Sequence, residues 1–219
     1  CPHCSAPIRA WQNIPLVSWL LLRGRCYQCR EPISLRYPLV ELAMGLLTVF
    51  VAWHLGVTWL ALGVMVLTWG LLALSLIDVD HQYLPDVLVL PLLWLGLILN
   101  STQHGFVTLQ DAVYGAVFGY LSLWTVFKLF KLFTGKEGMG YGDFKLLAML
   151  GAWGGWQILP LTILLSSLVG AVLGIIILQI QRKGMQQTLP FGPYLALAGW
   201  IALLWGEHIT DAYMQFAGL

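Results

Sequence analysis

Long uncharged apolar runs constrain the fold of this chain more than any other feature of its sequence. Leu55 to Ile77 contains no charged residue, and neither does the run from Leu146 to Gln181. A helix needs about 20 mostly apolar residues to cross a bilayer, and long runs without alternation favour helices over strands. The chain is 59% hydrophobic and 10% charged, too few charges to cover a soluble surface. The sequence therefore predicts an all-α polytopic membrane protein.

Composition also excludes two other classes of protein. The net charge of +1 leaves no excess of positive charge for nucleic-acid binding. A chain with this much apolar and aromatic content is not disordered. The expected partner is the lipid bilayer, with no nucleic acid, and the sequence does not specify an oligomeric state.

About seven transmembrane helices are expected from the positions of the apolar segments. The fifth is shorter than the others. The predicted spans are Tyr37–Trp53, Trp59–Ile77, Asp86–Leu99, Ala112–Phe130, Asp143–Trp153, Ile158–Gln181 and Pro190–Trp205.

The distribution of basic residues predicts the orientation of these spans. With seven spans and a cytoplasmic start, all 11 Lys and Arg residues fall on or near one face, in segments 9–36, 128–145 and 182–183. The opposite connections, such as His54–Thr58 and Asn100–Asp111, contain none. Positive residues concentrate on the cytoplasmic side of membrane proteins, so we expect the basic face to be cytoplasmic.

All four cysteines lie near the start of the chain, in two Cys-x-x-Cys pairs: Cys1 with Cys4, and Cys26 with Cys29. Each pair is followed after two residues by Pro-Ile, so the pairs form a short internal repeat. Two such turns can place four thiolates around one ion, and a tetrahedral set of sulfur ligands favours structural zinc. Two disulfides are the alternative, but stable disulfides are rare in the cytoplasm.

Two short stretches gather acidic residues at the cytoplasmic ends of predicted spans. One carries Asp78, Asp80 and Asp86, and the other carries Asp143 after glycines at 138, 140 and 142. Two carboxyl groups in one poorly solvated site share a proton and can work as general base and general acid. Polar loop residues between spans, or a proton relay in a transporter, are the other interpretations of these aspartates. Asp86 also fits the N-cap of the third span.

These motifs together resemble the type IV prepilin leader peptidases, the bifunctional enzymes of pilus and type II secretion systems. Gly140-Tyr141-Gly142-Asp143 matches the GxGD motif of that family, which it shares with presenilin-type membrane aspartic proteases. Asp78 precedes Leu84 and Pro85 at the spacing of the family's other catalytic segment. The doubled Cys-x-x-Cys and the segments 36–41 and 190–193 also resemble the family. The resemblance extends over essentially the whole chain.

The resemblance implies a catalytic pair, Asp78 and Asp143, with Asp80 and Asp86 as rival candidates. It implies cleavage of the basic leader of prepilins and pseudopilins after a glycine, at the cytoplasmic face of the bacterial inner membrane. It also implies N-methylation of the new N-terminus with S-adenosylmethionine as methyl donor. No nucleotide-binding signature locates the methyl donor, and Arg36, Tyr37 and Glu41 are the candidates for its site.

The expected organisation has two parts. Residues 1–36 form a cytoplasmic cysteine-rich, zinc-binding region, and residues 37–219 form a transmembrane aspartic peptidase domain. The family's first transmembrane segment precedes the first Cys-x-x-Cys, so a further segment is expected before Cys1. A polytopic transporter with buried proton-relay aspartates and a non-catalytic assembly scaffold are the competing hypotheses.

Overall fold

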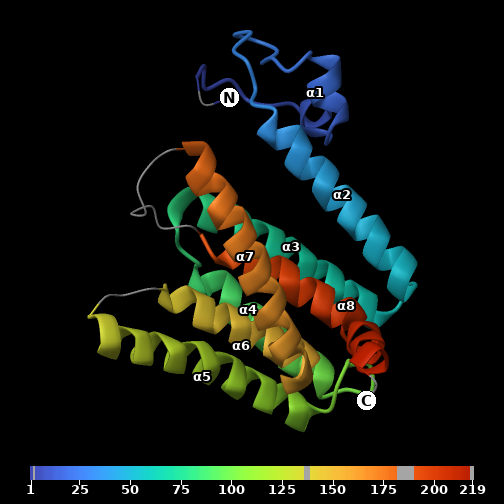
Figure 1. Ribbon diagram of the computed structural model, residues 1–219. Coiled ribbons are helices and arrows are strands. Elements are labelled where there is room, and N and C mark those ends of the chain that lie inside the picture. Colours follow the sequence, from blue (N-terminus) through green and yellow to red (C-terminus); the bar gives the residue numbers. More distant parts are fainter. Residues whose placement is uncertain (2, 136–138, 182–189, 218–219) are drawn as a thin grey trace. The chain divides into compact units, whose positions relative to one another are not determined.

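The computed structural model describes residues 1, 3–135, 139–181 and 190–217, and the side chains of 174–181 and 217 are not described. Gly138, Lys136, Arg182 and Lys183, which entered the sequence argument, lie outside the described residues. Every regular element in the described ranges is a helix (Figure 1). In chain order they are η1 (Ala10–Asn13), α1 (Val17–Leu21), α2 (Arg36–Leu55), α3 (Trp59–His81), α4 (Asp86–Asn100), α5 (Leu109–Thr134), α6 (Tyr141–Gly154), η2 (Trp156–Ile158), α7 (Leu159–Gln181) and α8 (Gly192–Ala217).

The prediction of an all-α membrane protein is confirmed. Each of the seven predicted spans corresponds to one of the helices α2 to α8. Within the described residues, four segments are long and apolar enough to cross a membrane: α2, α3, α5, and Trp156–Leu173, which includes the first part of α7. Helix α4 is apolar but has only 15 residues, and α6 has 14. At 1.5 Å per residue, α6 is about 21 Å long, which is shorter than the hydrocarbon core.

The chain divides into two compact units, Cys1–Val57 and Thr58–Leu219. The first contains the cysteine region together with α2. The second contains α3 to α8 and both acidic stretches. The predicted boundary between residues 36 and 37 separates a zinc-binding region from a peptidase domain, and it stays a prediction. The boundary between the two compact units lies after α2, between Val57 and Thr58.

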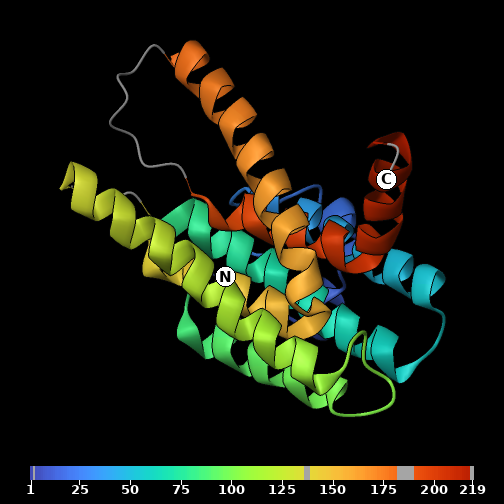
Figure 2. The same ribbon diagram turned by 60° about the horizontal axis from the view of Figure 1, so that its bottom comes forward.

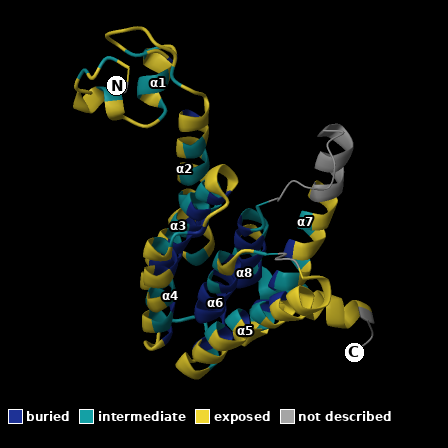
Figure 3. Cartoon of the chain, turned by 90° about the vertical axis from the view of Figure 1, so that its left-hand side faces the viewer, coloured by how far each residue is buried: buried dark blue, intermediate teal, exposed yellow. Residues whose placement is uncertain are grey.

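Helix α6 is the most buried helix of the second unit. Its residues from Asp143 to Gly154 are buried with one exception, Lys145 (Figure 3). Helices α4, α5, α7 and α8 all contact it. Because it is surrounded by protein, α6 does not need the length of a lipid-facing helix.

Glycines allow α5 and α6 to approach closely. Gly115 of α5 faces Gly151 of α6, and a Cβ atom added to either would overlap the backbone of the other helix. One turn further along α5, a Cβ on Gly119 would lie 2.7 Å from the carbonyl oxygen of Leu147. This Gly-x-x-x-Gly pattern is typical of tightly packed membrane helices, and the two helices lie side by side in Figures 1 and 2.

Two buried polar side chains fix the other end of α6. The Asn100 amide nitrogen donates to the carbonyl oxygens of Ala152 and Trp153, each at 2.9 Å. The Trp153 indole nitrogen donates to the Leu92 carbonyl oxygen at 2.9 Å. The two Asn100 bonds satisfy carbonyl groups at the C-terminal end of α6, which have no partner within the helix itself. All three bonds hold α6 against α4.

We expect Gly151→Ala to lower the free energy of unfolding by about 1–3 kcal/mol, because the new methyl group forces α5 and α6 apart. Gly45→Ala is the matched control, since a Cβ there meets nothing within 4 Å. It should leave stability unchanged or raise it by up to about 1 kcal/mol. Thermal unfolding in detergent measures both, and equal effects of the two substitutions would contradict this description of the interface.

Candidate active site

Asp78 lies in the last turn of α3, and its side chain is only 6% exposed. The helix ends three residues later, where Gln82 adopts a left-handed conformation with φ of 52°. The backbone N–H of Gln82 donates to the Asp78 carbonyl oxygen at 2.8 Å. Leu84 and Pro85 follow, and α4 begins at Asp86. The acidic stretch therefore includes the end of α3 and the start of α4.

Asp143 lies in the first turn of α6, and its side chain is 7% exposed. Gly140 occupies the N-cap position with extended backbone angles. A Cβ added to Gly140 would have one neighbour within 4 Å, the Asp143 carboxylate oxygen Oδ2 at 3.8 Å. The backbone at Gly140 therefore borders an uncrowded space beside the carboxylate.

Leu84 joins the two acidic stretches. Its side chain is buried, and a Cβ on Gly142 would lie 2.8 Å from the Leu84 Cβ. A Cβ on Gly192 would lie 3.4 Å from Leu84 Cδ1. Leu84 thus packs against both glycines, one from each of two distant segments. Because the Gly192 N–H also donates to the Asp78 carboxylate, Leu84 brings the segments of Asp78 and Asp143 together.

Gly192, the first residue of α8, contacts Asp78 directly. Its backbone N–H donates to Asp78 Oδ2 at 2.9 Å, and a Cβ at this position would lie 2.7 Å from the same oxygen. Backbone N–H groups at a helix N-terminus favour a carboxylate. The sequence of segment 190–193 indicates only a family resemblance, and its contact with Asp78 was not predicted.

The structure places the rival aspartates differently from Asp78. Asp80 is exposed, whereas Asp78 is buried. Both carboxylate oxygens of Asp86 accept from the Lys145 ammonium group, at 2.7 and 2.8 Å. The prediction that Asp86 is the N-cap of α4 is wrong. Pro85 holds that position, and Asp86 is the first helical residue. The ion pair links α4 to α6, and Lys145 was not identified from the sequence.

The described residues of the two Cys-x-x-Cys turns share two backbone features. In each, the residue after the second cysteine has a positive φ: 54° for Ser5 and 62° for Arg30. The N–H of Ser5 donates to the Cys1 carbonyl oxygen at 2.8 Å, and that of Arg30 donates to the Cys26 carbonyl oxygen at 3.1 Å. The internal repeat in the sequence is therefore also a repeat in the structure.

The four cysteine sulfurs gather at one point and form no disulfide. All four lie within 4.8 Å of one another, and the sulfurs of Cys1 and Cys29 are 3.9 Å apart. A tetrahedron with metal–sulfur bonds of about 2.3 Å has edges of about 3.8 Å. The cluster therefore has the donor set and the spacing to hold a metal ion.

The backbone around the cluster favours thiolate formation at one cysteine. The N–H groups of Cys29 and Gln28 lower the pKa of the Cys26 thiol to about 7. The N–H of Glu31 acts to lower the pKa of Cys29, but desolvation and the neighbouring sulfurs of Cys26 and Cys4 raise it above its usual value. A bound cation would offset the electrostatic repulsion between neighbouring thiolates.

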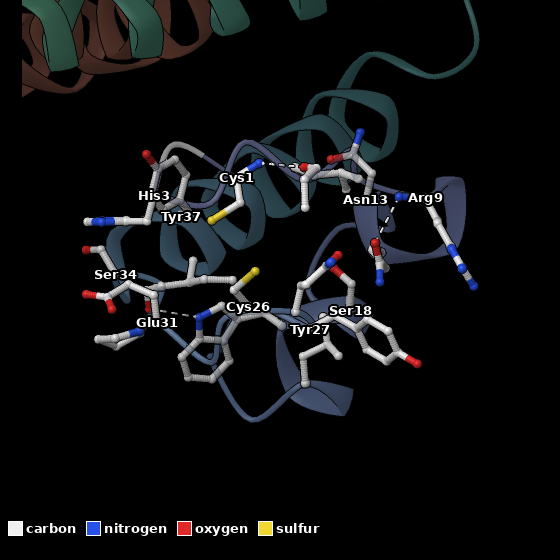
Figure 4. A pocket seen from close by; sticks show the side chains of 18 of the residues that line it. Cys1, His3, Arg9, Asn13, Ser18, Cys26, Tyr27, Glu31, Ser34 and Tyr37 are labelled. Atoms are coloured by element: carbon white, nitrogen blue, oxygen red, sulfur yellow. Dashed lines mark hydrogen bonds between the residues drawn. The ribbon is translucent and has the colours of Figure 1, made fainter.

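A cavity of about 550 Å³ lies in the first unit, beside the cysteine cluster (Figure 4). Cys1 and Cys26 contribute to its wall. Two of the three candidates for the methyl-donor site, Tyr37 and Glu41, also line it, whereas Arg36 does not. The cavity itself was not predicted, because its wall combines residues from η1, α1, the second cysteine turn and α2.

Two family profiles match the chain. The type IV leader peptidase family matches residues 65–175, and the bacterial peptidase A24 N-terminal domain matches residues 1–55. The first match includes both aspartates of the buried pair, and the second includes the four cysteines and the cavity.

Several curated proteins named prepilin leader peptidase/N-methyltransferase are similar to the chain over its length. One from Stutzerimonas stutzeri is 68% identical and one from Pseudomonas aeruginosa is 69% identical. Both alignments cover 100% of this chain and 75% of the relative. A relative from Legionella pneumophila is 50% identical over 99% of the chain. No solved structure matches the chain.

We expect Leu84→Ala to lower the free energy of unfolding by about 2 kcal/mol or more, because it leaves a cavity between Gly142 and Gly192. Leu90→Ala is the matched control, since Leu90 of α4 is 42% exposed, and its loss should cost less than about 1 kcal/mol. Thermal unfolding in the same detergent compares them. Indistinguishable stabilities would show that Leu84 does not join the two segments.

Proposed function

We propose, from the premise that the chain belongs to the type IV leader peptidase family, that Asp78 and Asp143 hydrolyse the leader of prepilins and pseudopilins. The family and the names of its relatives support a protease that is also an N-methyltransferase. The observation that carries the proposal is the convergence of two buried aspartates from helices far apart in sequence. Family membership favours peptide hydrolysis over the alternative of a proton-relay transporter.

The two carboxyl groups divide the chemistry of hydrolysis between them. One, as carboxylate, takes a proton from water, and the water oxygen bonds to the scissile carbonyl carbon. The other, protonated, donates to the carbonyl oxygen, and the carbon–nitrogen bond then breaks as the amine takes a proton. Two carboxyl groups sharing one site hold one proton between them, which supplies a base and an acid together. No metal is needed for this step.

The glycines of the GxGD segment have different roles in this proposal. Gly142 packs directly against Leu84, and this contact holds the Asp143 segment near Asp78. Gly140 borders the uncrowded space beside the Asp143 carboxylate. A substrate strand can approach the dyad along Gly140 because no side chain projects there.

The distribution of charge supports a cytoplasmic active site in the inner membrane. Asp78 lies at the end of α3 that precedes the connection to α4, and Asp143 lies at the start of α6. Lys128 and Lys131 lie near the end of α5, just before this start of α6. By the positive-inside rule this end of the helices faces the cytoplasm. Substrates with a basic leader would be cut on that side.

The four cysteines are assigned to structural zinc. Zinc prefers tetrahedral sulfur ligation, and four protein ligands leave no open position for catalysis. The metal would join the two Cys-x-x-Cys turns, which are otherwise separated by η1 and α1. Residues 1–36 are then a zinc-pinned cytoplasmic region, and residues 37–219 are the peptidase domain.

Methyl transfer is the second proposed activity, with S-adenosylmethionine as donor. When bound, this molecule supplies a methyl group activated by a positively charged sulfur. The residues of this chain that fit such a ligand are aromatic and acidic. Tyr37 and Glu41, one turn apart on the same face of α2, are of these types.

We expect Asp78→Asn and Asp143→Asn each to reduce prepilin cleavage by at least about 10³-fold, because either amide removes the acid–base pair. Asp86→Asn is the matched control and should retain cleavage within about fivefold, since its exposed ion pair is worth at most about 1 kcal/mol. Mass spectrometry of the product in lipid or detergent measures each rate.

Two results would contradict the assignment of the dyad. Near-normal cleavage by a folded Asp78→Asn or Asp143→Asn variant would remove that residue from the mechanism. A large loss in Asp86→Asn with unchanged thermal stability would make Asp86 part of the catalytic machinery.

Elemental analysis should find about one zinc ion per chain, since the four sulfurs form one site. Cys26→Ser should lose most of it, whereas His3→Ala should retain it, because four sulfurs complete the coordination. Zinc should also be released as the pH falls below about 6, because protons compete for the thiolates. Zinc-free protein with Cys1 in a disulfide would rule the site out.

A further inference from the structure

A cavity of about 730 Å³ lies in the second unit, at the opposite end of α6 from the acidic pair. Gly154, the last residue of α6, contributes to its wall. Asp143 is in the first turn of the same helix, about 16 Å away along the helix axis. The volume is within the roughly 300–1,000 Å³ typical of small-molecule pockets. The proposed hydrolysis uses none of the residues that line this cavity.

The wall of this cavity is built from four segments and is held together by Asn100. The segments are residues 105–107, the end of α6 with η2, the start of α7, and residues 202–211 of α8. The Asn100 side chain donates to the carbonyl oxygens of Ala152 and Trp153, and its Oδ1 accepts the Val107 N–H at 3.2 Å. The loop on one side of the cavity is therefore tied to α6, so this part of the wall is preorganised.

Two carboxylates give the wall a negative charge. Glu207 and Asp211 are four residues apart on α8 and both line the cavity, together with His208. None of the described lining residues is Lys or Arg. No hydrogen bond or ion pair joins either carboxylate to another residue that the structure describes. Like charges one helical turn apart repel each other, so the wall favours a positively charged ligand.

The rest of the wall is largely apolar and lies at the level expected of a membrane interface. Phe106, Ile158 and Leu161 supply apolar surface to the cavity. The exposed aromatic residues Trp156 and Tyr213 lie close to it in sequence, and such residues gather at membrane–water interfaces. The distribution of basic residues assigns this end of the helices to the face opposite the cytoplasm. A ligand that fits both parts of the wall has a cationic head and a hydrocarbon tail.

We propose that this cavity binds an aminophospholipid, such as phosphatidylethanolamine, from the leaflet opposite the cytoplasm. Its primary ammonium group lies between Glu207 and Asp211, where charge-assisted hydrogen bonds hold it, and its acyl chains lie along the apolar wall. The side-chain amide of Gln157, on the same wall, can donate to the phosphate. The proposal rests on the proposed orientation of the helices and on neither proposed activity. The bound lipid would join α8 to the end of α6 that Asn100 fixes.

Two other cationic ligands fit this wall less well. A metal ion needs several donor atoms around one point. Among the described residues, the four cysteines are the only group of His, Cys, Asp and Glu side chains that meets this requirement. A soluble amine would use the two carboxylates but would leave the apolar part of the wall without a partner.

Native mass spectrometry of the zinc-loaded enzyme in detergent measures lipid binding directly. The parent should bind dioctanoyl phosphatidylethanolamine at least about tenfold more tightly than dioctanoyl phosphatidylglycerol, because the second lipid has the same chains but no amine. Equal dissociation constants for the two lipids would overturn the proposal. Glycerophosphoethanolamine, the same head group without acyl chains, should bind at least about tenfold more weakly than the lipid. Equal binding of this soluble compound would overturn a lipid as the ligand.

A double substitution tests the two carboxylates. Glu207→Gln with Asp211→Asn should raise the dissociation constant for phosphatidylethanolamine at least about tenfold and leave that for phosphatidylglycerol unchanged. Asp111→Asn is the matched control, since Asp111 lies at the same end of the second unit, in the first turn of α5, but does not line the cavity. It should bind as the parent does. Unchanged binding of phosphatidylethanolamine by the double variant, or an equal loss in the control, would overturn the assignment.

Photo-crosslinking of the parent enzyme locates the site without any substitution. Phosphatidylethanolamine with a photoactivatable group in one acyl chain should label peptides from residues 105–107, 154–161 and 202–211. Label confined to other segments would overturn the proposal. Because every readout is binding, a parent enzyme that failed to cleave prepilin would remove the proposed peptidase function and leave this inference standing.

Discussion

The burial of α6 on all sides is the constraint on which the geometry of the acidic pair depends. Asp143 lies in the first turn of this helix, so its position is fixed by whatever holds α6. The Gly115–Gly151 contact sets the distance to α5, and the Asn100 amide fixes the C-terminal end through the carbonyl oxygens of Ala152 and Trp153. The first contact requires a residue without a side chain, and the second requires a polar side chain. An apolar residue such as leucine would provide neither contact.

The two carboxyl groups reach one site because Leu84 fills the space between their segments. It packs against Gly142 from the GxGD segment and against Gly192 at the start of α8. The N–H of Gly192 in turn donates to the Asp78 carboxylate. Three segments far apart in sequence therefore meet at one buried leucine. The GxGD glycines contribute to this arrangement in two ways. Gly142 has no side chain, which lets Leu84 pack against its backbone, and Gly140 leaves space beside Asp143.

The sequence predicted the helical fold and the positions of seven helices, because apolar run length is a local property. The choice of Asp78 and Asp143 as the catalytic pair rests on the family resemblance and stays a prediction. The depth of burial of α6 was not predicted, since a helix that faces protein and one that faces lipid are equally apolar. The Gly-x-x-x-Gly pattern at Gly115 and Gly119 was visible in the sequence and would have indicated the α5–α6 contact. The Asp86–Lys145 ion pair and the bond from Gly192 to Asp78 join residues distant in sequence, and no local pattern encodes such contacts. The Asp86 N-cap prediction failed because Pro85 already occupies the boundary position.

Thiol cross-linking of paired cysteine substitutions would show whether Asp78 and Asp143 face one site. Asp78→Cys with Asp143→Cys would be compared with Asp80→Cys with Asp143→Cys, using the shortest bifunctional thiol reagent and peptide mass mapping to exclude the four native cysteines. Asp80 lies about 200° around the helix from Asp78, and it is exposed where Asp78 is buried. We expect rapid bridging of residues 78 and 143 and slow bridging of residues 80 and 143. Equal rates for the two pairs, or no bridge between 78 and 143, would contradict it.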